Sequence, residues 1–383
     1  MAIENKEKKS ILHMDVSDIL KALKKKNSEK KNDKKGSKKK AKAVICKKAI
    51  SIDVGSENTK VVVGRYHKNK VSIDKAFSFK TPKGSIDDGH IKDIDNLAMA
   101  INDALDSNNV KNDNVIFTTN TTSIINRTII IPKVDEDEIE LVIKYEVQQY
   151  LPINLEDHMI QYNVLGEKVI DGNEKLEVLI VVYPNRMVYS YAELVNKIGG
   201  KPYALDLNYN SKRKAYYVMN PEIKESILSI DMGENIGLTI MKDNDLILIK
   251  TTKSGGNYLN SKISKVLGIS SENAEMQKRE NCNLMNREEG PLEHVVREVV
   301  DSWFDEANRI IKYYKSKSTQ NNIDKIYLCG GSSNIKGLER YVSTKLNMKV
   351  KIVQGNSNIE FKKGVEEVNI SEYINAIGAL IRL

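Results

Sequence analysis

Two short segments, one in each half of the chain, place a carboxylate and a glycine in the same order. Residues 51–55 read SIDVG and residues 229–233 read SIDMG, and each segment is followed by Glu-Asn and an apolar strand. A glycine in such a turn lets backbone N–H groups approach phosphate oxygens closely. The carboxylate would repel phosphate but can orient a hydrated Mg²⁺. One copy alone is typical of an ordinary β-turn, whereas two matched copies predict homologous halves facing each other across one cleft.

The side chains around these turns suit a triphosphate. We expect Ser56 and Asn58 to donate hydrogen bonds beside Gly55, and Lys60 to supply a cation, although Lys60 could equally be an ordinary strand-edge lysine. We expect Gly233 and Asn235 to close on the phosphates from the other side. Asp53 and Asp231 are the candidates for holding Mg²⁺, in each case through water.

A third glycine-rich turn follows later in the chain. Residues 327–329 read as the end of a strand that runs into Gly330, Gly331 and Ser332, and then into a helix. Such a turn lets the backbone pack flat against a nucleoside and directs a helix N-terminus toward phosphate. Alone it could be a tight strand–helix connection. After two Asp-x-Gly turns, it predicts that this segment contacts the nucleoside of the bound ligand.

The elements that must position these residues alternate between strands and helices. Apolar periodicity predicts strands at 49–54, 60–66, 71–79, 114–118, 121–131, 155–165, 176–183, 204–207, 226–231, 237–242, 246–250, 323–329 and 348–353. It predicts helices at 94–105, 135–151, 185–198, 257–267, 271–279, 292–314, 335–346 and 370–382. Mixed strands and helices in both halves indicate an α/β fold.

Charge divides the chain into a basic N-terminal tail and a nearly neutral body. The net charge is +8, but residues 1–48 contain 17 Lys and 6 Asp or Glu, which leaves −3 for the rest. The tail, residues 1–47, holds little to bury and should stay extended. Apolar residues at helical spacing within 11–23 predict a short helix there, either transient or formed on a partner or membrane surface. Sequence-specific nucleic-acid binding is not expected, because only charge supports it.

Cysteine usage and hydropathy indicate a cytoplasmic protein. Cys46, Cys282 and Cys329 form no CxxC pair, and the five His lack metal-ligand spacing. The first 14 residues contain no apolar core like that of a signal peptide. Apolar runs of about 18 residues are absent, so we expect no segment that spans a bilayer.

The three glycine turns in this order resemble those of the actin, Hsp70 and sugar-kinase superfamily. Within it, the chain resembles the PilM family of type IV pilus assembly proteins. The diagnostic segments are 127–132 (RTIIIP), 144–152 (KYEVQQYLP), 155–157 (LED), 162–166 (YNVLG) and 373–378 (YINAIG). The resemblance covers about residues 48–383 and leaves residues 1–47 outside.

The resemblance implies duplicated actin-like (ribonuclease H-like) domains around a central nucleotide cleft, with a small inserted FtsA-like subdomain. The first domain would comprise residues 48–119 and 201–222, the insert 120–200, and the second domain 223–383. By family position, Lys278 is a candidate contact to adenine or ribose; the alternative is a solvated lysine on a helix face. Relatives carry Ser or Thr where this chain has Glu234 and Asn235, which predicts a weaker phosphate contact there. Ser332 stands where they have a third glycine.

The resemblance also implies a partner. In the family, a groove beside the inserted subdomain takes the short cytoplasmic N-terminus of the inner-membrane protein PilN, an extended apolar peptide. We expect the groove along residues 124–131 and 139–150, with Ile129, Tyr145, Gln149 and Tyr150 as candidate lining residues. Packing in a core is the alternative for each aromatic ring.

These expectations describe a cytoplasmic ATP-binding scaffold, peripheral to the inner membrane, that links PilN and the other platform proteins to the pilus motor ATPase. At most a slow ATPase is expected, and no catalytic residue can be named. The alternatives are a small-molecule kinase of the same superfamily and an FtsA-like membrane tether. Self-association stays open. The Lys-rich tail could add attraction to anionic lipid, at about 1 kcal/mol per well-placed Lys.

Overall fold

The computed structural model describes residues 14–15, 48–111, 113–222, 224–286 and 290–382. The predicted Lys-rich tail, except its residues 14–15, and Cys46 lie outside the described residues. So does most of the predicted helix at 11–23. Within that segment, Met14–Asp15 form a strand (β1) rather than a helix and pair antiparallel with Leu205 and Ala204.

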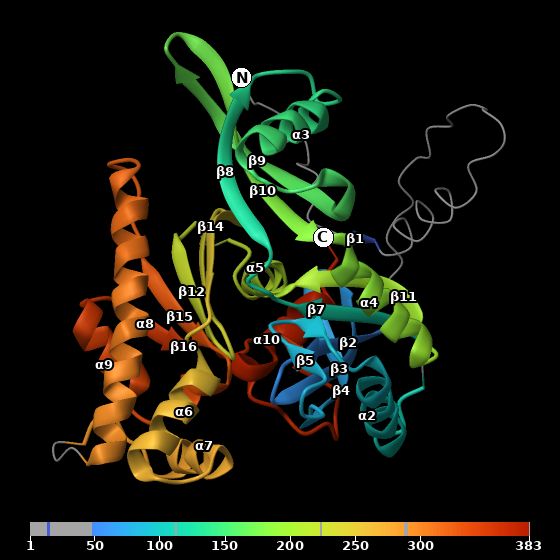
Figure 1. Ribbon diagram of the computed structural model, residues 1–383, viewed down its shortest axis with the longest axis vertical. Coiled ribbons are helices and arrows are strands. Elements are labelled where there is room, and N and C mark those ends of the chain that lie inside the picture. The colour runs from blue at the N-terminus through green and yellow to red at the C-terminus, as the bar shows by residue number, and fades with distance from the viewer. Residues whose placement is uncertain (1–13, 16–47, 112, 223, 287–289, 383) are drawn as a thin grey trace.

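Six strands from the first half of the chain and one from its end build a seven-stranded sheet, whose blue and green strands lie in the lower part of Figure 1. Its order is β1, β11 (Lys201–Leu207), β7 (Asn114–Thr119), β2 (Ala49–Val54), β3 (Asn58–His67), β4 (Lys70–Lys80) and β17 (Ile359–Phe361). β2 is antiparallel to β3 and parallel to β7. All six residues of β2 are buried, as expected for a central strand covered on both faces.

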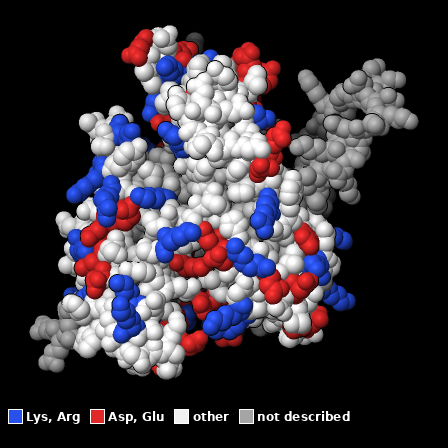
Figure 2. Space-filling view, in the orientation of Figure 1, with Lys and Arg blue, Asp and Glu red and all other residues white. Residues whose placement is uncertain are grey.

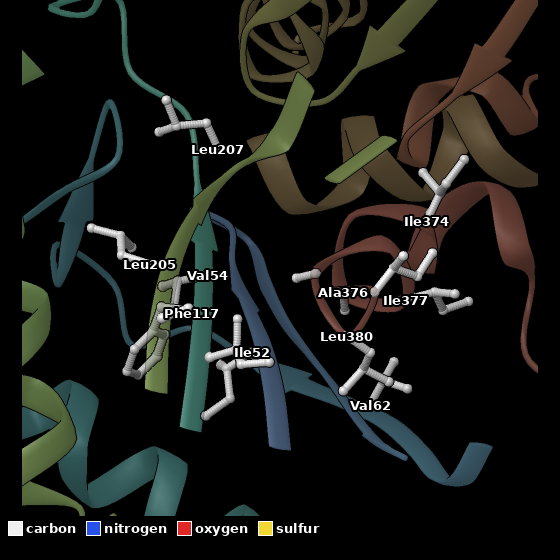
Figure 3. Packing of buried hydrophobic residues seen from close by; sticks show 14 of the residues in the cluster. Ile52, Val54, Val62, Phe117, Leu205, Leu207, Ile374, Ala376, Ile377 and Leu380 are labelled. Carbon is white, nitrogen blue, oxygen red and sulfur yellow. The ribbon is translucent and has the colours of Figure 1, made fainter. Parts of the chain in front are cut away.

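Helices from distant parts of the sequence cover this sheet. They are α2 (Ile94–Ser107), α4 (Asn185–Lys197), α5 (Asn208–Met219) and α10 (Ile370–Ala379). Residues of β2, β3, β7 and β11 share one hydrophobic cluster with residues of α10, as Figure 3 shows for Ile52, Val62 and Ile377. A short hairpin, β5 (Ile86–Asp87) and β6 (His90–Ile91), lies beside the sheet.

The second half repeats the opening pattern in a five-stranded sheet. Its order is β14 (Asp245–Thr252), β13 (Ile236–Lys242), β12 (Ile227–Met232), β15 (Lys325–Cys329) and β16 (Val350–Ile352). β12 is antiparallel to β13 and parallel to β15, as β2 is to β3 and β7. Its helices are α6 (Gly256–Leu267), α7 (Ser271–Glu280), α8 (Pro291–Ser316) and α9 (Leu338–Leu346). The predicted duplication is therefore present in the sheets.

A separate three-stranded sheet, at the top of Figure 1, follows β7 in the chain. Its order is β8 (Ile125–Pro132), β10 (Asn173–Pro184) and β9 (His158–Ile170), and a 3-10 turn, η1 (Leu155–Asp157), precedes β9. The helix α3 (Ile139–Tyr150) packs Ile139, Ile143 and Val147 against the sheet. These residues form a hydrophobic cluster distinct from those of the two larger sheets.

Four elements were not predicted from the sequence: α5, β5, β6 and β17. The segment of α5 reads NYNSKRKAYYVM and has no apolar stripe, yet ten of its twelve residues are buried, including three consecutive basic ones. Hydrophobic periodicity cannot reveal a helix that is enclosed on nearly all sides. The predicted helix at 335–346 begins later, at Leu338, after a 3-10 turn, η2 (Gly331–Asn334).

Two further expectations can be compared with the described part of the chain. No helix within it is long and apolar enough to cross a membrane. Cys282 and Cys329 are buried free thiols.

Candidate functional site

The two Asp-x-Gly turns face one cavity of about 520 Å³ between the large sheets. The sequence singled out twelve residues for nucleotide and metal, and all twelve line this cavity. They are Asp53, Gly55, Ser56, Asn58, Lys60, Asp231, Gly233, Asn235, Lys278, Gly330, Gly331 and Ser332. The fold therefore brings together residues from four distant segments that were selected for a single ligand.

The two aspartates converge on one amide nitrogen. Asn375 of α10 donates from Nδ2 to Asp53 at 3.3 Å and to Asp231 at 3.4 Å. The matched positions in β2 and β12 explain the symmetry, because each aspartate is the fifth residue of its strand. Sequence analysis included Asn375 in a family motif but gave it no role at the site.

Lys212 of α5 forms an ion pair with Asp231, with 2.9 Å between Nζ and Oδ2. The lysine is only 2% exposed, so both charges are largely removed from water. This residue was missed because its helix was missed. The sequence offers one signal for this buried helix, which is the run of three basic residues in the segment that follows strand β11.

Burial and neighbouring charges give the two aspartates different acidities. Burial raises the pKa of Asp53 to about 6, and the negative charge of Asp231 adds to the increase, while Lys60 and Asn375 oppose it. Burial acts on Asp231 in the same direction, but the charge and hydrogen bond of Lys212 outweigh it and lower the pKa of Asp231. Asp231 is therefore a permanent carboxylate, whereas Asp53 can hold a proton near neutral pH.

Glycine is required where the backbone of the turns approaches other groups. Gly330 has φ +86°, and a Cβ atom there would lie 2.7 Å from Oδ1 of Asp231 and 2.8 Å from the backbone of Met232. A Cβ atom on Gly55 would lie 2.8 Å from the carbonyl oxygen of Asn58. A side chain at either position would collide with these neighbouring atoms and displace the turn.

Several side chains of the turns hold the two halves together. The carboxylate of Glu234 accepts a hydrogen bond from Ser56, and Asn257 approaches the same hydroxyl at 3.5 Å. Asn235 donates to Asp88 at 2.8 Å. Ser56 and Asn235, which we expect to contact phosphate, line the cavity, and their side chains also contact the opposite half.

The glycine-rich turn faces a charged cluster on α7. The carboxylate of Glu275 accepts from Asn260 at 2.8 Å and from Arg279 at 2.6 Å, and it pairs with Lys278. Burial would raise the pKa of Glu275, but Lys278 and Arg279 lower it to about 2. The interpretation of Lys278 as a solvated lysine is wrong, because it is 3% exposed. The cluster presents a fixed carboxylate and cations at the wall opposite Gly331.

The residues around the aspartates are compatible with a hydrated Mg²⁺. Oδ1 of Asn375 is buried and has no hydrogen-bond partner among the described residues, so it can accept from a water bound to a metal. Asp53 could accept from another such water. Lys212 already neutralises Asp231, which favours contact through water over direct ligation. Within the described chain, no cluster of three or more His, Cys, Asp or Glu suits a metal held by protein ligands alone.

The four candidate partner residues lie on and around α3. Ile129 is partly buried against the cluster formed by α3 and its sheet. Tyr145 and Tyr150 are 62% and 60% exposed, so the alternative of core packing is wrong for both rings. Gln149 is exposed, and Arg127 lies over the ring of Tyr150 at 5.8 Å. Figure 2 shows a largely uncharged surface over this sheet, with charged side chains at its margins.

The duplicated sheets, the matched turns and the cavity between them define an α/β protein with the actin-like fold. The chain belongs to the family of type IV pilus assembly protein PilM, whose model matches residues 51–382.

Solved structures agree with this fold. A structure of a PilM–PilN type IV pilus biogenesis complex is similar with a TM-score of 0.75 at 19% identity, covering 87% of this chain and 97% of that one. The ethanolamine utilization protein EutJ from Carboxydothermus hydrogenoformans matches with a TM-score of 0.53 at 12% identity, covering 88% and 90%. MreB5 of Spiroplasma citri bound to ADP matches with a TM-score of 0.50 at 13% identity, covering 86% and 94%.

Proposed function

We propose that this protein binds Mg-ATP between its two large sheets and uses the complex as a scaffold in type IV pilus assembly. One observation supports this above all: two carboxylates from matched strands meet at one amide nitrogen, inside a cavity lined by three glycine turns. The similar MreB5 was solved with ADP. The phosphates would contact the turns at Gly55 and Gly233, and the adenosine would lie between Gly331 and α7.

A slow or absent turnover fits this arrangement better than rapid phosphoryl transfer. Among the described residues of the cavity wall, we identify no side chain that would position an attacking water. Lys212 and Asn375 hold the aspartates in fixed contacts. Bound nucleotide would then act by stabilising the contact between the two halves.

The partner in this proposal is the cytoplasmic N-terminal peptide of PilN, by analogy with the similar PilM–PilN complex. The uncharged surface near β8 and α3 suits an extended apolar peptide. Through that peptide the protein would sit in the cytoplasm at the inner membrane, between the platform proteins and the pilus motor ATPase. The Lys-rich tail would add attraction to anionic lipid, and a truncated variant lacking residues 1–47 should then bind anionic vesicles more weakly.

Calorimetric titration of the full chain with Mg-ATP tests the nucleotide site. We expect saturable binding, and a loss of about tenfold or more in affinity for Lys60→Ala, because a phosphate cation is removed; tenfold corresponds to about 1.4 kcal/mol. Lys201→Ala, which removes an exposed lysine at the start of β11, is the matched control. Absence of binding to the unaltered protein would end the proposal.

Two further measurements distinguish a scaffold that binds PilN from a small-molecule kinase. A peptide from a candidate PilN N-terminus should be retained by the immobilised protein, and retention should be compared with and without Mg-ATP. Rapid ADP release that depends on an added sugar would instead identify a kinase.

A further inference from the structure

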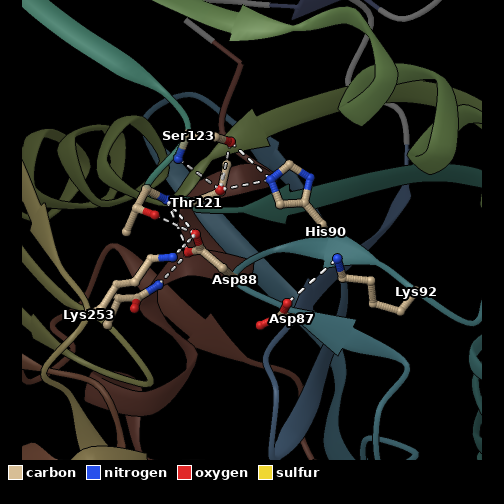
Figure 4. A network of polar contacts seen from close by, with 9 residues as sticks. Asp87, Asp88, His90, Lys92, Thr121, Ser123 and Lys253 are labelled. Atoms are coloured by element: carbon tan, nitrogen blue, oxygen red, sulfur yellow. Dashed lines mark hydrogen bonds and ion pairs between the residues drawn. The ribbon is translucent and has the colours of Figure 1, made fainter.

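One carboxylate beside the cavity joins three segments of the chain. Asp88 lies in the turn between β5 and β6, with φ +47°. Figure 4 shows it at the centre of a network of polar contacts. Its side chain is 15% exposed, so the carboxylate itself is largely shielded from water.

The first contact of Asp88 is to the loop that leads from β7 into β8. Asp88 accepts from the backbone N–H of Thr122 at 3.0 Å and from the hydroxyl of the same residue at 2.5 Å. Thr122 lies three residues before the first residue of β8. Asp88 therefore holds the segment through which the chain enters the three-stranded sheet.

The second contact is to the other half of the molecule. Asn235, in the second Asp-x-Gly turn, donates to Oδ1 of Asp88 at 2.8 Å, and Lys253, just after β14, lies 3.5 Å from Oδ2. Burial would raise the pKa of Asp88, but the hydrogen bonds from Thr122 and Asn235 outweigh it and lower the pKa. The carboxylate is therefore charged when it makes these contacts.

We propose that Asp88 is a relay that couples occupancy of the cavity at the second turn to the position of the three-stranded sheet. The inference rests on the proposed nucleotide function. A phosphate bound at Gly233 and Asn235 has to compete with Asp88 for the Asn235 amide or move that amide with the turn. Because the same carboxylate holds Thr122, either change reaches the start of β8 and the surface beside it.

The loop would keep other contacts if Asp88 were altered. His90 Nε2 lies 3.0 Å from the hydroxyl of Ser123 and 3.2 Å from that of Thr121. Asn120 donates to the hydroxyl of Thr251 at 3.4 Å. Loss of the Asp88 contacts should therefore release Thr122 from the second turn without unfolding the loop.

Hydrogen exchange of the full-length protein, measured with and without Mg-ATP, tests the relay. In the unaltered protein, Mg-ATP should change exchange by about fivefold or more, the lower end of common coupling between sites, both at 233–236 and at 121–132. In Asp88→Asn the change at 233–236 should remain and the change at 121–132 should disappear. Asparagine keeps the shape but cannot accept from Thr122, Asn235 and Lys253 together.

Asp87→Asn is the matched control, because Asp87 is the exposed neighbour of Asp88 and only pairs with Lys92, at 3.6 Å. It should behave like the unaltered protein. If Asp88→Asn fails to fold, Thr122→Val removes only the hydroxyl contact and should reduce the distant change. A change at 121–132 that persists in the Asp88 variant, or that is missing from the unaltered protein while 233–236 responds, overturns the relay alone. No response anywhere overturns the nucleotide function as well.

Discussion

The pKa values of the two aspartates of the cavity are shifted in opposite directions, because Lys212 forms an ion pair with Asp231 and not with Asp53. Lys212 is next to Asp231, so that carboxylate stays ionised, whereas at Asp53 the charges of Lys60 and Lys212 and the hydrogen bond from Asn375 do not offset burial. The ionised form of Asp231 is therefore stabilised, whereas the ionised form of Asp53 is disfavoured. A hydrated cation beside Asp53 would stabilise its ionised form.

The first prediction concerns Asp53→Asn. At pH 7.5 the variant should be more stable than the unaltered protein by up to about 3 kcal/mol, because a pKa near 6 in place of 3.8 disfavours the ionised form by about 1.4 kcal/mol per unit. Between these two pKa values the folded state binds a proton that the unfolded state has lost. The stability that this proton contributes is present below pH 4 and is lost as the pH rises through 6.

Urea unfolding at pH 5, 6 and 7.5 without nucleotide checks this prediction. The advantage of the asparagine variant should shrink as the pH falls. An advantage that does not vary with pH would mean that Asp53 titrates normally.

The second prediction concerns the buried ion pair. Lys212→Met should reduce the free energy of unfolding by about 3–5 kcal/mol, because Asp231 is left as an uncompensated buried charge. The double variant Lys212→Met with Asp231→Asn should recover most of this loss. Chemical denaturation of the unaltered protein, the two single variants and the double variant measures the coupling, and additive losses would show that the two charges act independently.

At the scale of elements, the contact between α5 and α10 determines where the site residues lie. α5 carries Lys212 and α10 carries Asn375, and Gly378 lets the two helices meet closely. A Cβ atom on Gly378 would lie 1.9 Å from the carbonyl oxygen of Ser211. The local backbone of α10 is ordinary helix, so the glycine is required by the neighbouring helix and not by its own φ.

The third prediction is that Gly378→Ala separates these helices. Because the opposing atom belongs to the backbone, we expect a loss of at least about 1–3 kcal/mol in stability and weaker Mg-ATP binding through displacement of Asn375. Gly166→Ala in β9 is the control, since a Cβ atom there meets nothing within 4 Å. Thermal unfolding and calorimetry report the two effects, and a variant with unaltered stability and binding would contradict the packing argument.

At the scale of the whole molecule, the two large sheets meet around the cavity. One face of the three-stranded sheet keeps its own hydrophobic cluster with α3, while Leu179, Val181 and Tyr183 on its other face belong to the cluster of the seven-stranded sheet. Contacts between the halves near the turns are polar, such as Glu234 with Ser56 and Asn235 with Asp88. Such contacts can rearrange at low cost compared with a hydrophobic interface. The relative position of the halves should therefore respond to a ligand that bridges them.

The fourth prediction is that Mg-ATP stabilises the protein against unfolding. At a free ligand concentration 100 times Kd, the gain should be about 2.7 kcal/mol. The urea midpoint should rise with Mg-ATP concentration in the unaltered protein and rise much less in Gly330→Ala, whose Cβ atom would meet Asp231. Gly364→Ala, with a similar φ of +85° and nothing within 4 Å, controls for backbone strain. An equal rise in both variants would place the ligand elsewhere.

Local patterns in the sequence determined the strands, most helices and the two Asp-x-Gly turns, because alternation and glycine placement act over a few residues. They also identified eleven of the twelve candidate residues that line the cavity, while Lys278 came from the family resemblance. Only the tertiary structure decided which side chains control them. Asn375 contacts Asp53 across 322 positions of sequence, and Lys212 lies on a helix without an apolar stripe. Asp88 lies in a short turn whose importance depends on partners in three other segments. No local pattern records such contacts, because they arise only when the two halves fold against each other.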